Sequence, residues 1–197
     1  MDWLKYLVPF AGIAFGAWLA PWIEGRKAKA EAKEAILCFF TEAQDYTAIA
    51  KDYLENMHEC HRKATQRKVG MIRTDADFYP IKLPSKVYFL SIDRVISKAF
   101  HATTPELRNA LRSLTMIVES VNSYSDTLKK YQQKEDFDIE IIYAASKQYA
   151  IFYYLVSRLA EEKERYKSFK LPQDQIIESV FNALNLSFEM TDQCKNV

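Results

Sequence analysis

Residues 55–61 carry three side chains that could bind a metal ion. Glu55, His58 and His61 are spaced three residues apart as ExxHxxH. On a helix this spacing places a carboxylate and an imidazole on one face, as in di-iron bundles, whose sites also need carboxylates on facing helices. Met57 and Cys60 define the core side of this helix, and His58 falls beside it. We therefore predict a solvated helix face here, with no metal and no other cofactor.

The cysteine, histidine and glycine content argues against several catalytic classes. Cys38, Cys60 and Cys194 are odd in number and form no CxxC pair, so we expect neither a disulfide framework nor a zinc site. Cys60 lies in an apolar seam, where a thiol is buried and inert. The chain has three histidines and four glycines, and it contains no GxSxG, Walker-type or HExxH motif. The motifs of the chain therefore predict no enzyme activity.

Arg94 and His101, in the stretch RVISKAFH, form a second candidate pair. The stretch resembles the R-x(4–6)-H pattern of HEPN-type ribonucleases, which are also helical bundles. Val95 stands where that family usually has a polar residue. The resemblance implies a ribonuclease with Arg94 and His101 as catalytic residues. The other interpretation is a surface arginine and a histidine at a helix C-terminus, where a cation is favoured.

The densest basic patch lies near residue 65. It comprises Arg62, Lys63, Arg67 and Lys68, with His61 and Arg73 beside it. A net charge of +1 argues against a dedicated nucleic-acid-binding protein. We therefore interpret the patch as the solvated end of a helix.

A long helix must position most of these residues. Residues 24–35, EGRKAKAEAKEA, consist almost entirely of strong helix formers, and Lys27 can pair with Glu31. A heptad pattern follows, formed by Ile36, Phe39, Ala43, Tyr46, Ala50, Tyr53, Met57, Cys60 and Ala64, with Leu37, Phe40 and Leu54 on its flank. The first breaker is Gly70. We predict one helix that forms a stalk and the first bundle helix over residues 25–68.

The remaining chain repeats the helical pattern over residues 69–190. Residues 69–84 hold Gly70, Pro80 and Pro84 and predict an ordered loop. Helices are expected over about 85–101, from Thr104-Pro105 to about 131, over 137–168 and over 173–190. Residues 191–197 are expected to be a frayed tail. The sequence predicts an all-α fold, with a four- to five-helix cytoplasmic bundle.

An apolar stretch precedes the stalk. Residues 3–23, WLKYLVPFAGIAFGAWLAPWI, hold one charged side chain, Lys5. A bilayer core needs about 20 apolar residues in a helix. A cleaved signal peptide would have a basic start and small residues before its cleavage site. Here Met1-Asp2 is not basic, and Trp18 and Pro21 beside the best candidate cleavage site disfavour cleavage. We therefore predict an uncleaved anchor over residues 1–24.

The flanks of this stretch predict its orientation, and its small residues predict association. The juxtamembrane basic residues Arg26, Lys27, Lys29 and Lys33 follow it. The positive-inside rule then places the N-terminus outside the cell and the bulk of the chain in the cytoplasm. Gly12 and Gly16 form GxxxG, which lets two membrane helices approach closely. Both features fit a single-pass protein of the cell membrane.

Three function classes follow from these patterns. The first is a membrane-anchored interaction or assembly protein, a homo-oligomer held by the lipid bilayer that binds a cytoplasmic protein partner. The second is a small membrane effector whose oligomerised anchor perturbs the bilayer. Its plan resembles that of small single-span proteins of bacterial defence or toxin cassettes. The third is an anchored HEPN-like ribonuclease.

Overall fold

The computed structural model describes residues 3–71, 82–133, 138–168 and 171–188, without the side chains of residues 3–12, 14, 132 and 133. Within these ranges it contains five α-helices and no strand, which confirms the predicted all-α class. The helices are α1 (Trp3–Lys68), α3 (Ser91–Ala99), α4 (Pro105–Gln133), α5 (Ile139–Glu162) and α6 (Gln173–Ala183), and the short 3-10 helices are η1 (Phe100–Ala102) and η2 (Lys163–Arg165).

The long helix α1 contributes to two compact units. Unit 1 comprises residues 1–39 and 90–102, and unit 2 comprises residues 40–89 and 103–197. The prediction of a single helix through the stalk and the heptads is confirmed, because α1 is unbroken to Lys68. It ends at Lys68, two residues before Gly70, whose φ of 73° costs glycine little. The Met71 N–H donates to the Gln66 carbonyl at 2.9 Å.

Unit 1 pairs the first part of α1 with α3. The buried apolar side chains of unit 1 come from both helices. They are Ala32, Ala35, Ile36 and Phe39 of α1 and Ile92, Val95 and Ala99 of α3. These four α1 residues, spaced at i, i+3, i+4 and i+7, form one face of the helix.

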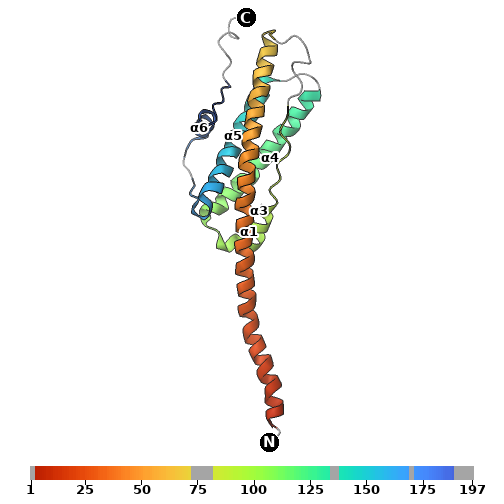
Figure 1. Cartoon of the computed structure of the whole chain (residues 1–197), viewed down its shortest axis with the longest axis vertical. Coiled ribbons are helices and arrows are strands. Elements are labelled where there is room, and N and C mark those ends of the chain that lie inside the picture. Colours follow the sequence, from red (N-terminus) through yellow and green to blue (C-terminus); the bar gives the residue numbers. More distant parts are fainter. Residues whose placement is uncertain (1–2, 72–81, 134–137, 169–170, 189–197) are drawn as a thin grey trace. The chain divides into compact units, whose positions relative to one another are not determined.

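Unit 2 is built around α5. Helix α4 packs along one side of α5 and α6 along another (Figure 1). The predicted apolar face of α5 is confirmed, since Ile142, Ala145, Tyr149, Phe152, Val156 and Leu159 are all fully buried. Tyr149 meets Tyr53 of α1 edge-on, with ring centroids 5.7 Å apart. The predicted start of α4 is also confirmed, because Thr104 Oγ1 accepts the Leu107 N–H at 3.2 Å.

The helix expected over residues 85–101 begins only at Ser91. Residues 84–88, which we call the strap, run outside any helix along α1 and α4 in unit 2. Side chains of those two helices supply the partners that a helix would have provided internally. Tyr46 Oη donates to the Tyr88 carbonyl at 2.7 Å and accepts the Tyr88 N–H at 3.0 Å.

The α4 side of the strap is paired in the same manner. Asn122 Oδ1 accepts the Val87 N–H at 2.7 Å, and Asn122 Nδ2 donates to the Val87 carbonyl at 2.9 Å. Ser125 Oγ donates to the Pro84 carbonyl at 2.7 Å. The Val87 side chain itself is fully buried. Tertiary hydrogen bonding therefore replaces the helical bonds of this segment.

Other helix ends and faces also differ from prediction. Helix α5 ends at Glu162 rather than 168, and α6 ends at Ala183 rather than 190. At the end of α6, Asn185 adopts φ 53° and the Leu186 N–H donates to the Phe181 carbonyl at 2.8 Å, a left-handed C-terminal cap. Leu37, expected on the flank of the heptad pattern, is exposed. Within the predicted helix 85–101, Leu90 and Ile96 are exposed, whereas Val95 is fully buried.

Parts of three predictions lie outside the described residues. They are positions 72–81 of the predicted loop 69–84, positions 134–137 at the junction of the helices predicted to about 131 and over 137–168, and the tail 191–197 with Cys194.

Candidate functional site

Large apolar side chains of α1 face outward in unit 1. Those of Ile13, Phe15, Trp18, Trp22 and Ile23 are between 52% and 72% exposed. At 100° per residue these positions spread around the helix rather than along one stripe. A helix that packs on one protein surface would bury one of its sides.

The predicted membrane span extends beyond what the structure describes. Its greater part, residues 1–12 and 14, lies outside the described side chains. In the described part of the chain, no helix combines the length and the apolar character needed to cross a membrane.

An arginine–aromatic pair follows the exposed apolar positions. The Arg26 guanidinium carbon lies 4.0 Å from the centroid of the Trp22 ring, a cation–π contact. Sequence reasoning named both residues but missed their pairing, for which the signal was their i, i+4 spacing. The predicted Lys27–Glu31 pair is confirmed at 4.0 Å. Lys29 and Lys33 are exposed.

The GxxxG motif is described only in part. A Cβ placed on Gly16 would meet nothing within 4 Å, and the same holds for Gly25. The side-chain position of Gly12 lies outside the described residues. The Gly16 position of α1 is therefore open to a second helix as far as the described residues are concerned.

Two ion pairs join α3 to α1 within unit 1. Arg94 Nη2 lies 2.9 Å from Glu34 Oε1, and Lys98 Nζ lies 3.1 Å from Glu31 Oε2. The hydrogen bond from Lys98 lowers the pKa of Glu31 below its usual value. Sequence reasoning did not anticipate these acidic partners, because they are about 60 residues distant.

The candidate ribonuclease pair is divided between two elements. Arg94 lies in α3 and its guanidinium binds the Glu34 carboxylate, with Cys38 Sγ at 3.9 Å. His101 lies in η1, beyond the end of α3, and its ring meets that of Phe100 edge-on at 5.8 Å. Arg94 therefore joins α3 to α1 through an ion pair.

The histidines of ExxHxxH are placed differently from prediction. His61 is only 4% exposed, so the expected solvated face is wrong at this position. Its ring lies 5.3 Å from Phe188 and 6.4 Å from Tyr143, and His58 lies 5.4 Å from Phe188. The segment after α6 covers this part of α1 through Phe188, a long-range contact that local spacing does not reveal.

Burial sets the protonation chemistry of this region. It lowers the pKa of His61, with a smaller contribution from the neighbouring His58. It also raises the pKa of the Cys60 thiol to about 12, which agrees with the predicted inert cysteine. Among the described side chains, no group of three or more His, Cys, Asp or Glu residues is arranged to hold a metal ion.

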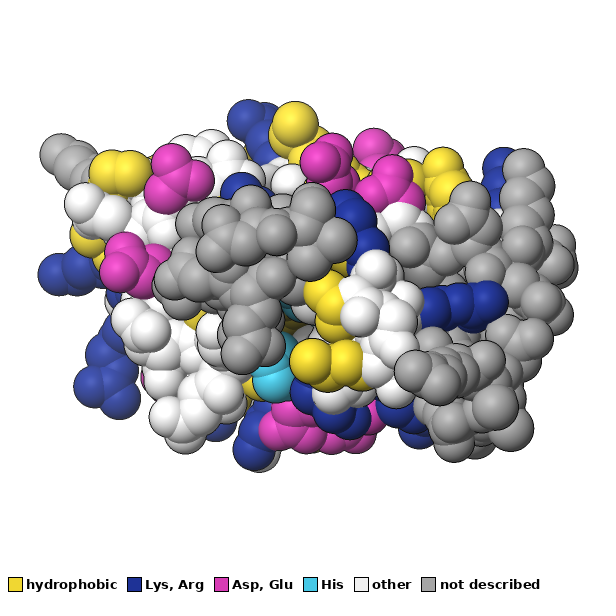
Figure 2. Space-filling model, turned by 90° about the horizontal axis from the view of Figure 1, so that it is seen from above, with side chains coloured by type: hydrophobic (Ala, Val, Ile, Leu, Met, Phe, Trp, Pro, Cys, Tyr) yellow, Lys and Arg dark blue, Asp and Glu magenta, His cyan; other side chains and the backbone are white. Residues whose placement is uncertain are grey.

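The predicted basic patch near residue 65 is partly neutralised. Arg62 forms two hydrogen bonds to Glu59, at 2.8 and 2.7 Å, and Lys63 lies 3.7 Å from the same carboxylate. Lys68 is exposed, and Arg67 is partly buried. Figure 2 shows basic side chains interspersed with acidic ones rather than gathered into one region.

Comparison of the chain with models of known protein families, with curated proteins and with solved structures found no match.

Proposed function

We propose that this protein is a single-pass membrane protein that self-associates through its anchor and presents a helical bundle to a cytoplasmic protein partner. The outward-facing apolar side chains between Ile13 and Ile23 carry the proposal. Lipid covers all sides of a helix, which suits apolar groups that no described part of the chain covers.

The boundary of the anchor is supported by chemistry on both sides of Ile23. Trp22 is an aromatic residue of the kind enriched at the headgroup level, and Arg26 lies over its ring. Arg26, Lys27, Lys29 and Lys33 then favour the cytoplasmic side for all that follows. An anchored topology with the bundle inside the cell accounts for the apolar stretch and the charge asymmetry together.

Membrane extraction tests the anchor. Membranes that contain the full chain are washed with alkaline carbonate, and sealed vesicles of known orientation are treated with protease. We expect the chain to stay in the pellet and the bundle to be cleaved only when the cytoplasmic face is accessible. Release by carbonate alone, without detergent, would contradict the proposal.

Self-association is tested by a matched pair of glycine variants. Gly16→Ile should reduce crosslinked oligomers in membranes, because a bulky side chain prevents close helix approach. Gly25→Ile is the control, since a Cβ at Gly25 would also meet no atom within 4 Å. Gly25 is nine residues after Gly16, which places the two on opposite sides of α1. Equal crosslinking in the two variants would refute association through the Gly16 face. If expression depolarises the membrane in a Gly16-dependent manner, the effector alternative replaces an assembly role.

A further inference from the structure

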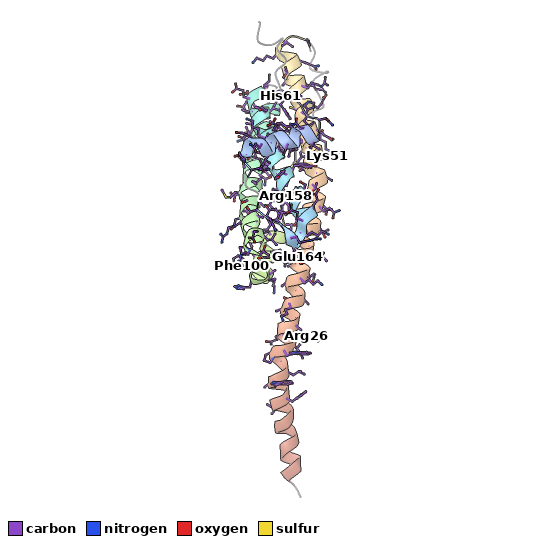
Figure 3. The ribbon with its side chains drawn as sticks, turned by 90° about the vertical axis from the view of Figure 1, so that its left-hand side faces the viewer. Arg26, Lys51, His61, Phe100, Arg158 and Glu164 are labelled. Carbon is purple, nitrogen blue, oxygen red and sulfur yellow. The ribbon has the colours of Figure 1, made fainter. Side chains whose placement is uncertain are left out.

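The direction of α3 is defined by its two ion pairs with α1. Arg94 pairs with Glu34, and Lys98 pairs with Glu31, so advancing along α3 means moving back along α1. The 3-10 helix η1, Phe100–Ala102, follows α3 directly, so it adjoins the end of α3 that pairs with Glu31. In Figure 3 Arg26 lies on α1 beyond Phe100, on the side of the N-terminus.

This end of unit 1 lies close to the headgroup level if α1 is the anchor. Glu31, the partner of Lys98, is about 14 Å along the helix axis from Trp22, at 1.5 Å per residue. The headgroup layer is about 5–8 Å thick on each side of the bilayer core. The field of an anionic surface extends about another 8 Å at physiological salt.

The side chains at this end suit an anionic interface. Phe100 is 37% exposed, and His101 and Ala102 are exposed beside it. Lys27 and Lys98 share the single carboxylate of Glu31, which leaves this group of three with a net positive charge. An aromatic ring with basic neighbours is the combination that membrane interfaces favour.

We propose that η1 and the adjoining Lys98 and Lys27, here called the η1 tip, bind anionic phospholipid headgroups of the cytoplasmic leaflet. This inference rests on the proposed membrane anchor. It adds a second lipid contact, contributed by residues distant in sequence from the anchor. The contact would hold α3 and α1 at a defined height above the bilayer.

Hydrogen exchange of the reconstituted full chain tests the η1 tip. The protein is placed in vesicles of phosphatidylcholine alone and of phosphatidylcholine with phosphatidylglycerol, and amide exchange is measured over residues 98–104. Two basic residues near an anionic surface contribute about 1 kcal/mol each. We expect exchange to slow about tenfold or more in the anionic vesicles, and high salt to remove the difference.

Two double variants with the same change in charge locate the contact. Lys27→Gln with Lys98→Gln removes the basic groups of the tip and should abolish the effect of anionic lipid. Lys29→Gln with Lys33→Gln changes residues on the opposite side of α1 from Glu31, so this variant should retain most of the effect of anionic lipid on exchange. Phe100→Ala, which leaves the ion pairs intact, should weaken the protection in anionic vesicles.

The outcomes separate this inference from the proposed anchor. Equal exchange at residues 98–104 in the two lipids, with the chain still resistant to carbonate, would overturn the η1 contact alone. Equal effects of the two double variants would overturn it as well, because the contact would not be local. Release of the chain by carbonate would overturn both proposals.

Discussion

Asn122 offers a quantitative test of how the strap is held in unit 2. Its side chain accepts the N–H of Val87 and donates to the carbonyl of the same residue. Substitution by alanine leaves both backbone groups without these partners beside a fully buried side chain. Each unsatisfied buried group costs about 1–3 kcal/mol, so we expect Asn122→Ala to lower the free energy of unfolding by about 2–6 kcal/mol.

The measurement is chemical denaturation of the full chain in detergent micelles, followed by circular dichroism. Asn122→Leu keeps the branching and the number of side-chain heavy atoms but removes both hydrogen bonds, so it should lose a similar amount. The control is Asn109→Ala, an exposed asparagine on the same helix, which should change stability by less than about 0.7 kcal/mol. If all three variants unfold alike, water replaces the Asn122 bonds and our reasoning about the strap is incorrect.

Three further expectations concern individual side chains. Because the pKa of His61 is lowered in the folded state, the unfolded chain binds a proton at a higher pH than the folded chain does. The contribution of His61 to stability is therefore fully present above a pH of about 6.5. Below that pH the free energy of unfolding decreases, by at most about 1.4 kcal/mol per pH unit. His61→Leu should reduce this slope in denaturation between neutral and mildly acidic pH, and an unchanged slope would exclude His61 as its source. Cys60 should react with iodoacetamide much more slowly than the less buried Cys38, since its thiol pKa is raised to about 12; equal rates in the native protein would contradict this. Thr104→Ala should lower the free energy of unfolding by about 1 kcal/mol through loss of the α4 cap, and no measurable change would indicate that water replaces it.

Local patterns predicted the helices that carry strong periodicity. Most heptad residues of α1 are buried as expected, with Tyr46 and Tyr53 half-buried, and the apolar face of α5 is fully buried. One covered side of a helix imposes a period near 3.6. The N-terminal cap of α4 at Thr104 and the end of α1 just before Gly70 were also predictable from the sequence, since both involve hydrogen bonds to backbone groups a few residues away.

The strap was not predictable by the same means. The apolar residues of segment 85–101 fit a helix, and Val87 is indeed buried. The choice depends on Tyr46 and Asn122, which lie about 40 residues before it and 35 after it. Only the folded unit brings these hydrogen-bonding groups to the backbone of residues 87 and 88.

The features of the candidate sites also divide into those that the sequence predicts and those that depend on long-range contacts. The sequence by itself determined the all-helical class, the apolar stretch before residue 24 and the basic residues that follow it. These properties depend on residue type and short spacing. The tertiary structure decided that His61 is covered by Phe188, that Arg94 binds Glu34 and that Lys98 binds Glu31. Each of those contacts joins residues tens of positions apart, where composition and periodicity carry no information about which groups meet.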